Sequence, residues 1–205
     1  MNKICILDYG IGNTKSVINI LENISIPWIL TNNKEEIVKS SHYILPGVGS
    51  YKNAIYQFKK IIPLLTLENE IFKKKKPLMG ICVGMQMMST NGYEFEKVKG
   101  LNWIEGDVIK MKTKNSPLPH VGWNNVNFVK SSPIFDKIEN DSDFYFLNSY
   151  CFQLKDKKYL IGNTNYDNEF SSAIQCDNLF GVQFHPEKSQ KKGKKLLENF
   201  FNLSQ

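Results

Sequence analysis

The sequence predicts a three-layer α/β fold, in which helices flank a mostly parallel central sheet that carries an antiparallel extension. In the first half of the chain, short apolar runs alternate with segments whose apolar residues recur at helical spacing. This alternation is typical of a parallel sheet covered by helices. In the second half, strand-like runs follow one another with only turn residues between them, which favours antiparallel pairing.

Each element of the first half has its own signal. The apolar run at 3–8 predicts a strand, and the helical spacing of apolar residues over 13–23 predicts a helix. Pro63 suits the first turn of a helix and the lysines at 73–76 suit its last, so a helix is expected between them. The remaining expected elements of this half are strands at 26–30, 43–45 and 77–81 and helices at 51–60 and 83–89.

The second half predicts a series of strands and one closing helix. The strands are expected at 106–112, 123–129, 143–153, 158–163, 171–176 and 179–184, and the helix at 196–203. No internal repeat, low-complexity tract or linker interrupts the chain. Its 205 residues fit one domain, so residues 1–205 are expected to fold together.

The composition is that of a globular protein, with 41% hydrophobic and 22% charged residues. No apolar run approaches the ~20 residues of a membrane helix, and the N-terminus lacks the layout of a signal peptide, so we expect a cytoplasmic protein without a membrane partner.

The net charge of +6 comes from lysine alone, because the sequence contains no arginine. Without the planar fork of arginine, and with no nucleic-acid motif, a nucleic-acid partner is not expected. The lysine clusters at 73–76 and 188–195 are interpreted as solvated helix ends, or alternatively as attraction for an acidic partner or an anionic substrate.

Three of the four cysteines carry no chemical signal. Cys5, Cys151 and Cys176 lie in no CxxC pair and in no metal-ligand grouping, so neither a disulfide nor a metal site is predicted. We expect them to be small buried side chains with free thiols.

Cys82 differs, because it lies between two glycines, after an apolar run and before a helical pattern. This is the sequence form of a nucleophile elbow, a sharp strand-to-helix turn that holds one side chain out at the edge of a sheet. A thiol at such a helix start is favoured as the thiolate. Cys82 is therefore the predicted nucleophile.

His185 is the predicted base. It follows a strand and precedes Pro186, which favours an extended conformation at His185. In an extended segment, residues two apart point to the same side, so Glu187 is expected to reach the imidazole and fix its tautomer. Nucleophile, base and orienting carboxylate together form the general arrangement for covalent catalysis.

An acyl intermediate also needs hydrogen-bond donors for its oxyanion. The elbow supplies the backbone N–H of Val83, and the glycine-rich segment 47–49 after a strand is a candidate for the second donor. Gln86 lies one helical turn after the cysteine, so its amide is placed to face the site. His42 is expected to be structural, and His120 is expected to serve a turn or packing, with a binding role as the alternative.

Two segments, GICVGMQ at 80–86 and FHPE at 184–187, resemble the class I, triad-type glutamine amidotransferases. Within that family the chain is similar to the HisH group, the glutaminase subunits of imidazole glycerol phosphate synthase. The segments that carry this closer similarity are DYGIGN at 8–13, LPGVG at 45–49, PHVGWN at 119–124 and GVQFHPEKS at 181–189. They span nearly the whole chain in the order of the family, which implies a single glutamine amidotransferase type 1 domain.

The resemblance implies a reaction. Cys82 would attack the side-chain amide of L-glutamine, release ammonia and form a glutamyl thioester, which water would hydrolyse to glutamate. His185 would move protons and Glu187 would orient it. No cofactor is implied. The oxyanion and substrate contacts would come from Gly47, Val48, Gly49, Val83 and Gln86.

The resemblance also implies a partner. The family passes ammonia to a HisF-like (β/α)8-barrel cyclase subunit, which forms imidazole glycerol phosphate in histidine biosynthesis. Asn13, Trp123 and Asn124 would lie near the interface of this heterodimer.

Two departures from the family pattern leave alternatives open. Asn148 stands where family members commonly carry histidine, and Val83 stands where leucine is usual. The first departure allows a paralogous glutaminase that supplies an amidino-sugar synthase for surface polysaccharide. A non-catalytic regulator on the same fold and a stand-alone hydrolase of another small amide are further alternatives, and the intact triad argues against the regulator.

Overall fold

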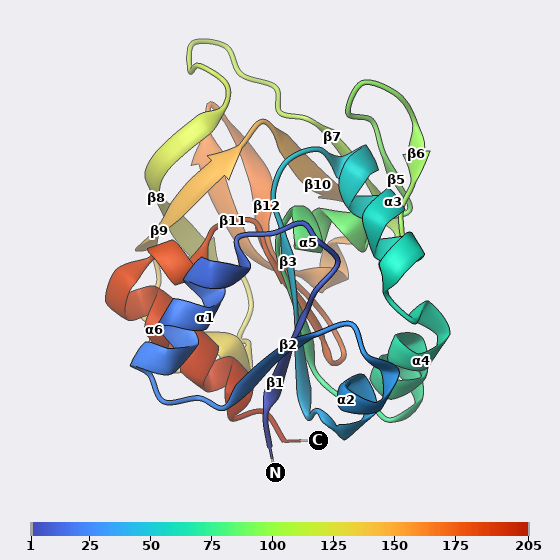
Figure 1. Cartoon of the computed structure of the whole chain (residues 1–205). Coiled ribbons are helices and arrows are strands. Elements are labelled where there is room, and N and C mark those ends of the chain that lie inside the picture. Colours follow the sequence, from blue (N-terminus) through green and yellow to red (C-terminus); the bar gives the residue numbers. More distant parts are fainter. Residues whose placement is uncertain (1, 205) are drawn as a thin grey trace.

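A nine-stranded mixed sheet runs through the computed structural model, which describes residues 2–204 (Figure 1). Its strand order is β2-β1-β3-β4-β13-β12-β11-β8-β9. The first five strands in this order pair in parallel and the remaining four pair antiparallel, which confirms the predicted parallel sheet with an antiparallel extension. One strand of the second half departs from the expected antiparallel pairing, because β13 joins the parallel strands beside β4. The parallel strands are β1 (Ile4–Leu7), β2 (Trp28–Thr31), β3 (His42–Gly47), β4 (Leu78–Cys82) and β13 (Leu179–Val182). The antiparallel strands are β8 (His120–Phe128), β9 (Ser142–Asn148), β11 (Leu160–Tyr166) and β12 (Asn168–Cys176).

Helices cover the parallel strands on both sides, which confirms the three-layer prediction (Figure 1). On one side α1 (Thr14–Asn23) lies against α6 (Gln190–Phe201). On the other side lie α3 (Tyr51–Ile61) and α4 (Leu64–Glu68), which continues as a π-helical turn at Asn69–Lys73. The remaining α-helices are α2 (Lys34–Lys39), which the sequence patterns did not predict, and α5 (Val83–Met87). No helix within residues 2–204 is both long and apolar enough to cross a membrane.

A second, four-stranded sheet was not predicted. Its order is β10-β7-β5-β6, formed by β5 (Asn91–Gly92), β6 (Val98–Lys99), β7 (Gly106–Lys110) and β10 (Tyr150–Leu154). The predicted single strand 143–153 is therefore wrong, because the chain leaves the large sheet after Asn148 and enters the small one at Tyr150. A continuous strand-like composition does not reveal a change of pairing partner, because the residues on both sides of the break are of types that favour strands.

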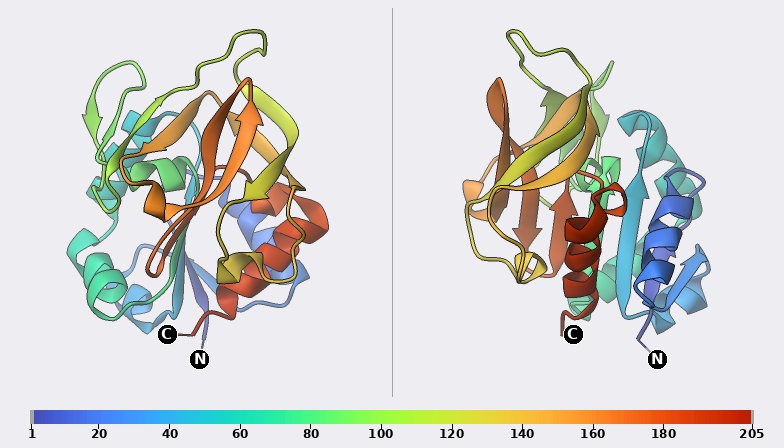
Figure 2. Two further views of the ribbon diagram at one scale, coloured as in Figure 1. Left: turned by 180° about the vertical axis from the view of Figure 1, so that it is seen from behind. Right: turned by 90° about the vertical axis from the view of Figure 1, so that its left-hand side faces the viewer.

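The apolar residues that predicted the parallel half form its core. Side chains of β1, β3 and β4 are almost completely buried, and α1 contributes Val17, Ile20 and Leu21 from one face. Figure 2 shows, from behind and from the side, that the antiparallel strands, coloured from yellow-green to orange, stand next to this half. The termini lie at the same end of the molecule, opposite the carboxyl ends of β1 and β3 (Figure 1).

Two expectations about the lysine clusters need correction. Lys76 is largely buried rather than solvated, because its ammonium lies 2.6 Å from the buried Glu70 carboxylate and donates to the Val38 carbonyl at 2.7 Å. The closing helix begins at Gln190, six residues before the predicted start at 196. Its first turns are lysine-rich and so lack the apolar spacing on which the prediction relied.

Candidate active site

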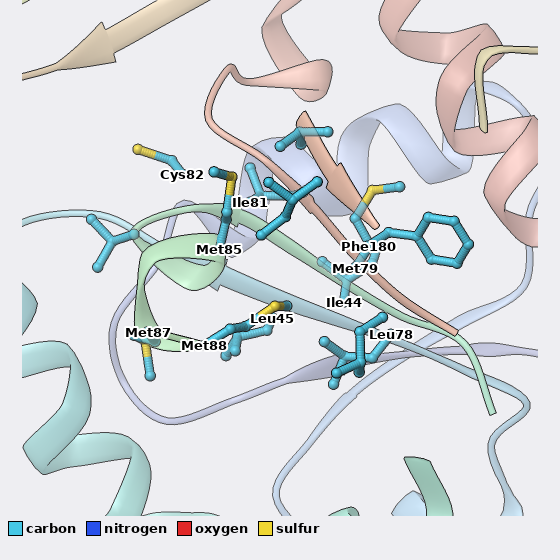
Figure 3. Packing of buried hydrophobic residues seen from close by; sticks show 14 of the residues in the cluster. Ile44, Leu45, Leu78, Met79, Ile81, Cys82, Met85, Met87, Met88 and Phe180 are labelled. Carbon is cyan, nitrogen blue, oxygen red and sulfur yellow. The ribbon is translucent and has the colours of Figure 1, made fainter. Parts of the chain in front are cut away.

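Cys82 occupies the predicted elbow. It is the last residue of β4 and the N-cap of α5, with φ 55° and ψ −113°. A non-glycine residue rarely adopts a positive φ, and such strain is concentrated at functional sites. Figure 3 shows the Cys82 side chain at the end of the buried strand, with Ile81, Met85 and Leu45 packed behind the turn.

The flanking glycines are required by close backbone contacts. A Cβ on Gly84 would lie 1.9 Å from the Leu45 carbonyl oxygen, and one on Gly80 would lie 2.7 Å from the Met85 nitrogen. A Cβ on Gly47, at the end of β3, would lie 2.4 Å from the Gly84 nitrogen. The first turn of α5 therefore packs directly on the backbone of β3, which fixes the elbow against the glycine-rich segment.

His185 and Glu187 form a buried pair beside the elbow. They follow β13, the parallel neighbour of β4, in which Val182 is paired with Ile81. The Nδ1 atom of His185 lies 2.8 Å from Oε1 of Glu187, and both side chains are at most 3% exposed. His185 is extended as predicted, but the segment Pro186–Lys188 is a 3₁₀ turn, so the carboxylate reaches the ring through a turn and not through a continued strand.

The surroundings of His185 favour its protonated form. Burial alone lowers the pKa of the imidazole, but contacts with Cys82 and Glu187 raise it to about 10. The His185 Nε2 atom is buried and has no hydrogen-bond partner among the described residues. Because Glu187 occupies Nδ1, this Nε2 atom is the one left for a nucleophile or a leaving group.

A pocket of about 370 Å³ opens above the elbow. It brings together five of the predicted site residues with His185, and it has further walls that the sequence did not predict. The predicted residues that line it are Val48, Gly49, Cys82, Val83, Gln86 and His185, and the unpredicted ones are Glu94, Phe95, Pro119, Leu147, Asn148, Ser149 and Tyr150. Gly47 lies beneath the pocket, against Gly84, and Glu187 lies behind His185. Such a volume fits a ligand of amino-acid size with a few polar contacts.

A buried amide pair touches the thiol. The Gln86 Nε2 atom donates to Oε1 of Gln183 at 2.9 Å and to the Tyr150 carbonyl at 3.0 Å. The Gln183 Nε2 atom in turn lies 3.6 Å from the Cys82 sulfur. Gln183 was not predicted as a site residue, although its position two residues before His185 places both on one side of an extended segment.

Glu94 is a charged site residue that sequence reasoning missed. It comes from the loop between β5 and β6, and its Oε2 accepts a 2.6 Å hydrogen bond from the backbone N–H of Tyr51 at the start of α3. The contact places a carboxylate in the wall of the pocket. A loop of no regular periodicity gives no sequence signal for such a placement.

The predicted interface residues lie outside the pocket. Asn13 precedes α1, and Trp123 is 48% exposed on β8 with its ring edge on Tyr145. Asn124 points to the other face of β8, where its amide donates to the Asn165 carbonyl at 2.9 Å.

The two remaining histidines are structural, as expected. His42 contacts the Ser41 hydroxyl at 2.9 Å and the Leu203 carbonyl at 3.2 Å. His120 is buried and stacks between Phe146 and Tyr166.

Comparison with known proteins agrees with this geometry. The family model described as glutamine amidotransferase class-I matches residues 5–203. The chain is 43% identical to imidazole glycerol phosphate synthase subunit HisH 2 of Methanococcus maripaludis, over 96% of this chain and 98% of that one. It is 42% identical to subunit HisH of Pelagibacter ubique, over 98% and 99% of the two chains.

Solved structures with much lower identity share the fold. The structure of PurLQS from Thermotoga maritima aligns with a TM-score of 0.74 at 16% identity, covering 98% of both chains. The glutaminase domain of Trypanosoma brucei CTPS with bound acivicin aligns with a TM-score of 0.67 at 15% identity, over 100% of this chain and 96% of that one. With the family model spanning nearly the whole sequence, this chain belongs to the class-I glutamine amidotransferase family.

Proposed function

We propose that this chain is the glutaminase subunit of an imidazole glycerol phosphate synthase, which hydrolyses L-glutamine to glutamate and supplies ammonia to a cyclase subunit. The observation that carries the proposal is the strained Cys82 elbow beside the buried His185–Glu187 pair, in one pocket of amino-acid size. The names of the relatives at 42–43% identity, all HisH subunits, support the assignment of the synthase. The continuous buried core supports a single domain.

In the first half-reaction, the Cys82 thiolate attacks the side-chain carboxamide carbon of glutamine and forms a C–S bond. The carbonyl electrons move to oxygen and give a tetrahedral oxyanion. The intermediate collapses to a thioester as the C–N bond breaks, and protonated His185 gives its Nε2 proton to the leaving nitrogen, which departs as ammonia. Glu187 holds the imidazole through Nδ1, so that Nε2 faces the pocket.

In the second half-reaction, neutral His185 accepts a proton from water as the water attacks the thioester carbon. The C–S bond breaks, glutamate leaves and the Cys82 thiolate is restored beside the imidazolium. Backbone N–H groups of Val83 and of the segment Gly47, Val48 and Gly49 stabilise the oxyanion in both steps. Gln86 helps to shape the substrate site through its contacts with Tyr150 and Gln183. No step requires a cofactor.

The ammonia passes to a HisF-like (β/α)8 cyclase subunit, with which the chain forms a heterodimer. In this heterodimer the cyclase subunit catalyses the lyase step of the synthase. Both subunits are cytoplasmic in this proposal. Trp123 supports such an interface because a large aromatic side chain half exposed on a sheet is typical of binding surfaces. Asn13 and Asn124 are placed at the margin of the same interface.

The test combines the purified chain with the HisF-type subunit of the same organism and measures glutamate and imidazole glycerol phosphate. We expect both products from glutamine, and we expect the gene pair to rescue a histidine auxotroph that lacks both subunits. Glutamate release without imidazole glycerol phosphate would indicate another acceptor synthase, such as the amidino-sugar enzyme, which the names of the relatives do not favour. Absence of glutamate with any partner would indicate a regulator, and strong partner-free hydrolysis of other small amides would indicate a stand-alone hydrolase.

A further inference from the structure

Tyr9 makes a buried contact that the proposed mechanism does not use. It lies two residues after β1, is completely buried, and its hydroxyl donates a 2.5 Å hydrogen bond to the carbonyl oxygen of Pro46. The same hydroxyl lies 3.7 Å from the Met87 sulfur in α5. Pro46 is the residue directly before the glycine-rich segment. The contact therefore fixes the backbone at the start of the segment that carries the proposed oxyanion donors.

The side chain of Tyr9 is fixed in place. Its ring meets the ring of Phe58 edge-on, with centroids 5.5 Å apart and an interplanar angle of 84°. Burial and the nearby Cys82 raise the pKa of the Tyr9 hydroxyl far above its usual value, so it remains a protonated donor. The loop that carries Tyr9 also packs on the acceptor residue, since a Cβ on Gly12 would lie 3.1 Å from the Pro46 ring.

The Pro46 carbonyl has no strand neighbour to satisfy it on the β1 side. The pairing of β1 with β3 ends at Ile6 and Ile44, two residues before Pro46. A buried carbonyl without a partner is costly, and the Tyr9 hydroxyl supplies the donor. On the β1 side the acceptor is thus held by one side chain, while on the other side Pro46 is paired with Ile81 of β4.

This bond also orients the next residue. The peptide unit between Pro46 and Gly47 is planar, so fixing the carbonyl oxygen of Pro46 fixes the direction of the Gly47 N–H. On its other side, Gly47 is pressed against Gly84 and Val83 of the elbow. Gly47 is therefore held from two sides, by Tyr9 through the peptide plane and by α5 through close packing.

We propose that Tyr9 is a positioning residue, whose hydroxyl bond to the Pro46 carbonyl sets the orientation of the oxyanion loop Gly47, Val48 and Gly49 relative to Cys82. The inference rests on the proposed function, because it assigns Tyr9 to the oxyanion site of glutamine hydrolysis. Tyr9 touches neither substrate nor thiol in this role. It acts on the transition state alone, so its loss lowers kcat and leaves KM unchanged.

The test compares Tyr9→Phe with Tyr43→Phe in the complex with the cyclase subunit. Tyr43 is the matched control, since it is also completely buried and its hydroxyl donates to a backbone carbonyl at 2.8 Å, but this carbonyl belongs to Ile37 in α2 and not to the entry of the glycine-rich segment. We expect kcat for glutamate release to fall about 10-fold in Tyr9→Phe, a fraction of the effect of losing an oxyanion donor. We expect Tyr43→Phe to keep the wild-type kcat. Thermal unfolding should show similar, small losses for both variants.

A second measurement separates an effect on oxyanion stabilisation from an effect on the reactivity of the thiol. Alkylation of Cys82 by iodoacetamide forms no tetrahedral oxyanion, so Tyr9→Phe should be alkylated at the wild-type rate while its kcat falls. Tyr9→Met also fills the space without a hydroxyl, so it should show the same fall in kcat and the same alkylation rate as Tyr9→Phe. It replaces Tyr9→Phe in the test if that variant does not fold.

The inference is overturned if kcat is unchanged in the Tyr9 variants, if both tyrosine positions lower it equally, or if alkylation slows together with kcat. A wild-type chain that releases no glutamate would instead contradict the proposed function.

Discussion

The parallel half of the large sheet and the remaining strands contribute different parts of the pocket. The carboxyl ends of β3, β4 and β13 supply the elbow, the glycine-rich segment and the His185–Glu187 pair. The junction of β9 and β10 and the loop between β5 and β6 supply the walls, including Asn148, Tyr150 and Glu94. The comparison indicates that the rigid parallel strands fix the reacting groups, whereas the later strands shape the space that the substrate enters.

The largest expected effect concerns the nucleophile of the parallel half. Cys82→Ala removes the only sulfur among the described residues that line the pocket, so kcat for glutamate release should fall by about 10⁴-fold or more. Thermal unfolding should stay close to wild type because alanine keeps the buried turn filled. Steady-state kinetics with the cyclase subunit measures the loss. Activity within about 10-fold of wild type, which corresponds to about 1.4 kcal/mol in the activation free energy, would contradict the assignment.

A second prediction compares one glycine from each half. Gly84→Ala forces a Cβ to 1.9 Å from the Leu45 carbonyl, so we expect a loss of about 3 kcal/mol or more in the free energy of unfolding. Gly122→Ala in β8 meets no atom within 4 Å and suffers only from its φ of +129°, so a loss of about 1 kcal/mol is expected. Denaturant unfolding of both variants checks the ranking, and equal losses would contradict the close packing of the elbow.

A third prediction concerns the partner of the base. Glu187→Gln removes a negative charge that raises the pKa of His185, so the pKa measured by NMR should fall, and kcat should drop about 100-fold. The pKa of His185 is higher in the folded state than in the unfolded state, so proton binding by His185 stabilises the fold. This stabilisation is fully present below the unfolded-state pKa of 6.5 and is lost as the pH rises toward the folded-state pKa of about 10. The stability gap between wild type and Glu187→Gln should therefore be widest near pH 6 and narrow at alkaline pH. A gap that widens with pH would refute this sign.

The smallest effect is expected at the amide that touches the thiol. Gln183→Met keeps the volume but removes the N–H group that lies 3.6 Å from the Cys82 sulfur. We expect iodoacetamide to alkylate Cys82 about 3-fold more slowly at neutral pH, because the thiolate loses a stabilising donor. Gln175→Met, at a partly buried glutamine on β12 that does not line the pocket, is the control and should leave the rate unchanged.

The sequence predicted the parallel half better than the rest, for physical reasons. Glycines around Cys82 and the proline after His185 constrain the backbone locally. The elbow and the pair of His185 with Glu187 could therefore be predicted from the sequence alone. The walls depend on contacts between distant segments, such as the one from Glu94 to Tyr51. The break between Asn148 and Tyr150 changes the pairing partner without changing the composition, and so left no signal.

The central claim is that Cys82 forms a covalent bond with the acyl group of glutamine. Rapid mixing of the complex with glutamine, acid quenching and mass spectrometry of the peptide that contains Cys82 test it most directly. We expect a mass increase of one glutamyl group on Cys82 in the wild type, and no such increase in Cys82→Ala. A glutamyl group found on another residue, or glutamate release by Cys82→Ala at the wild-type rate, would contradict the claim.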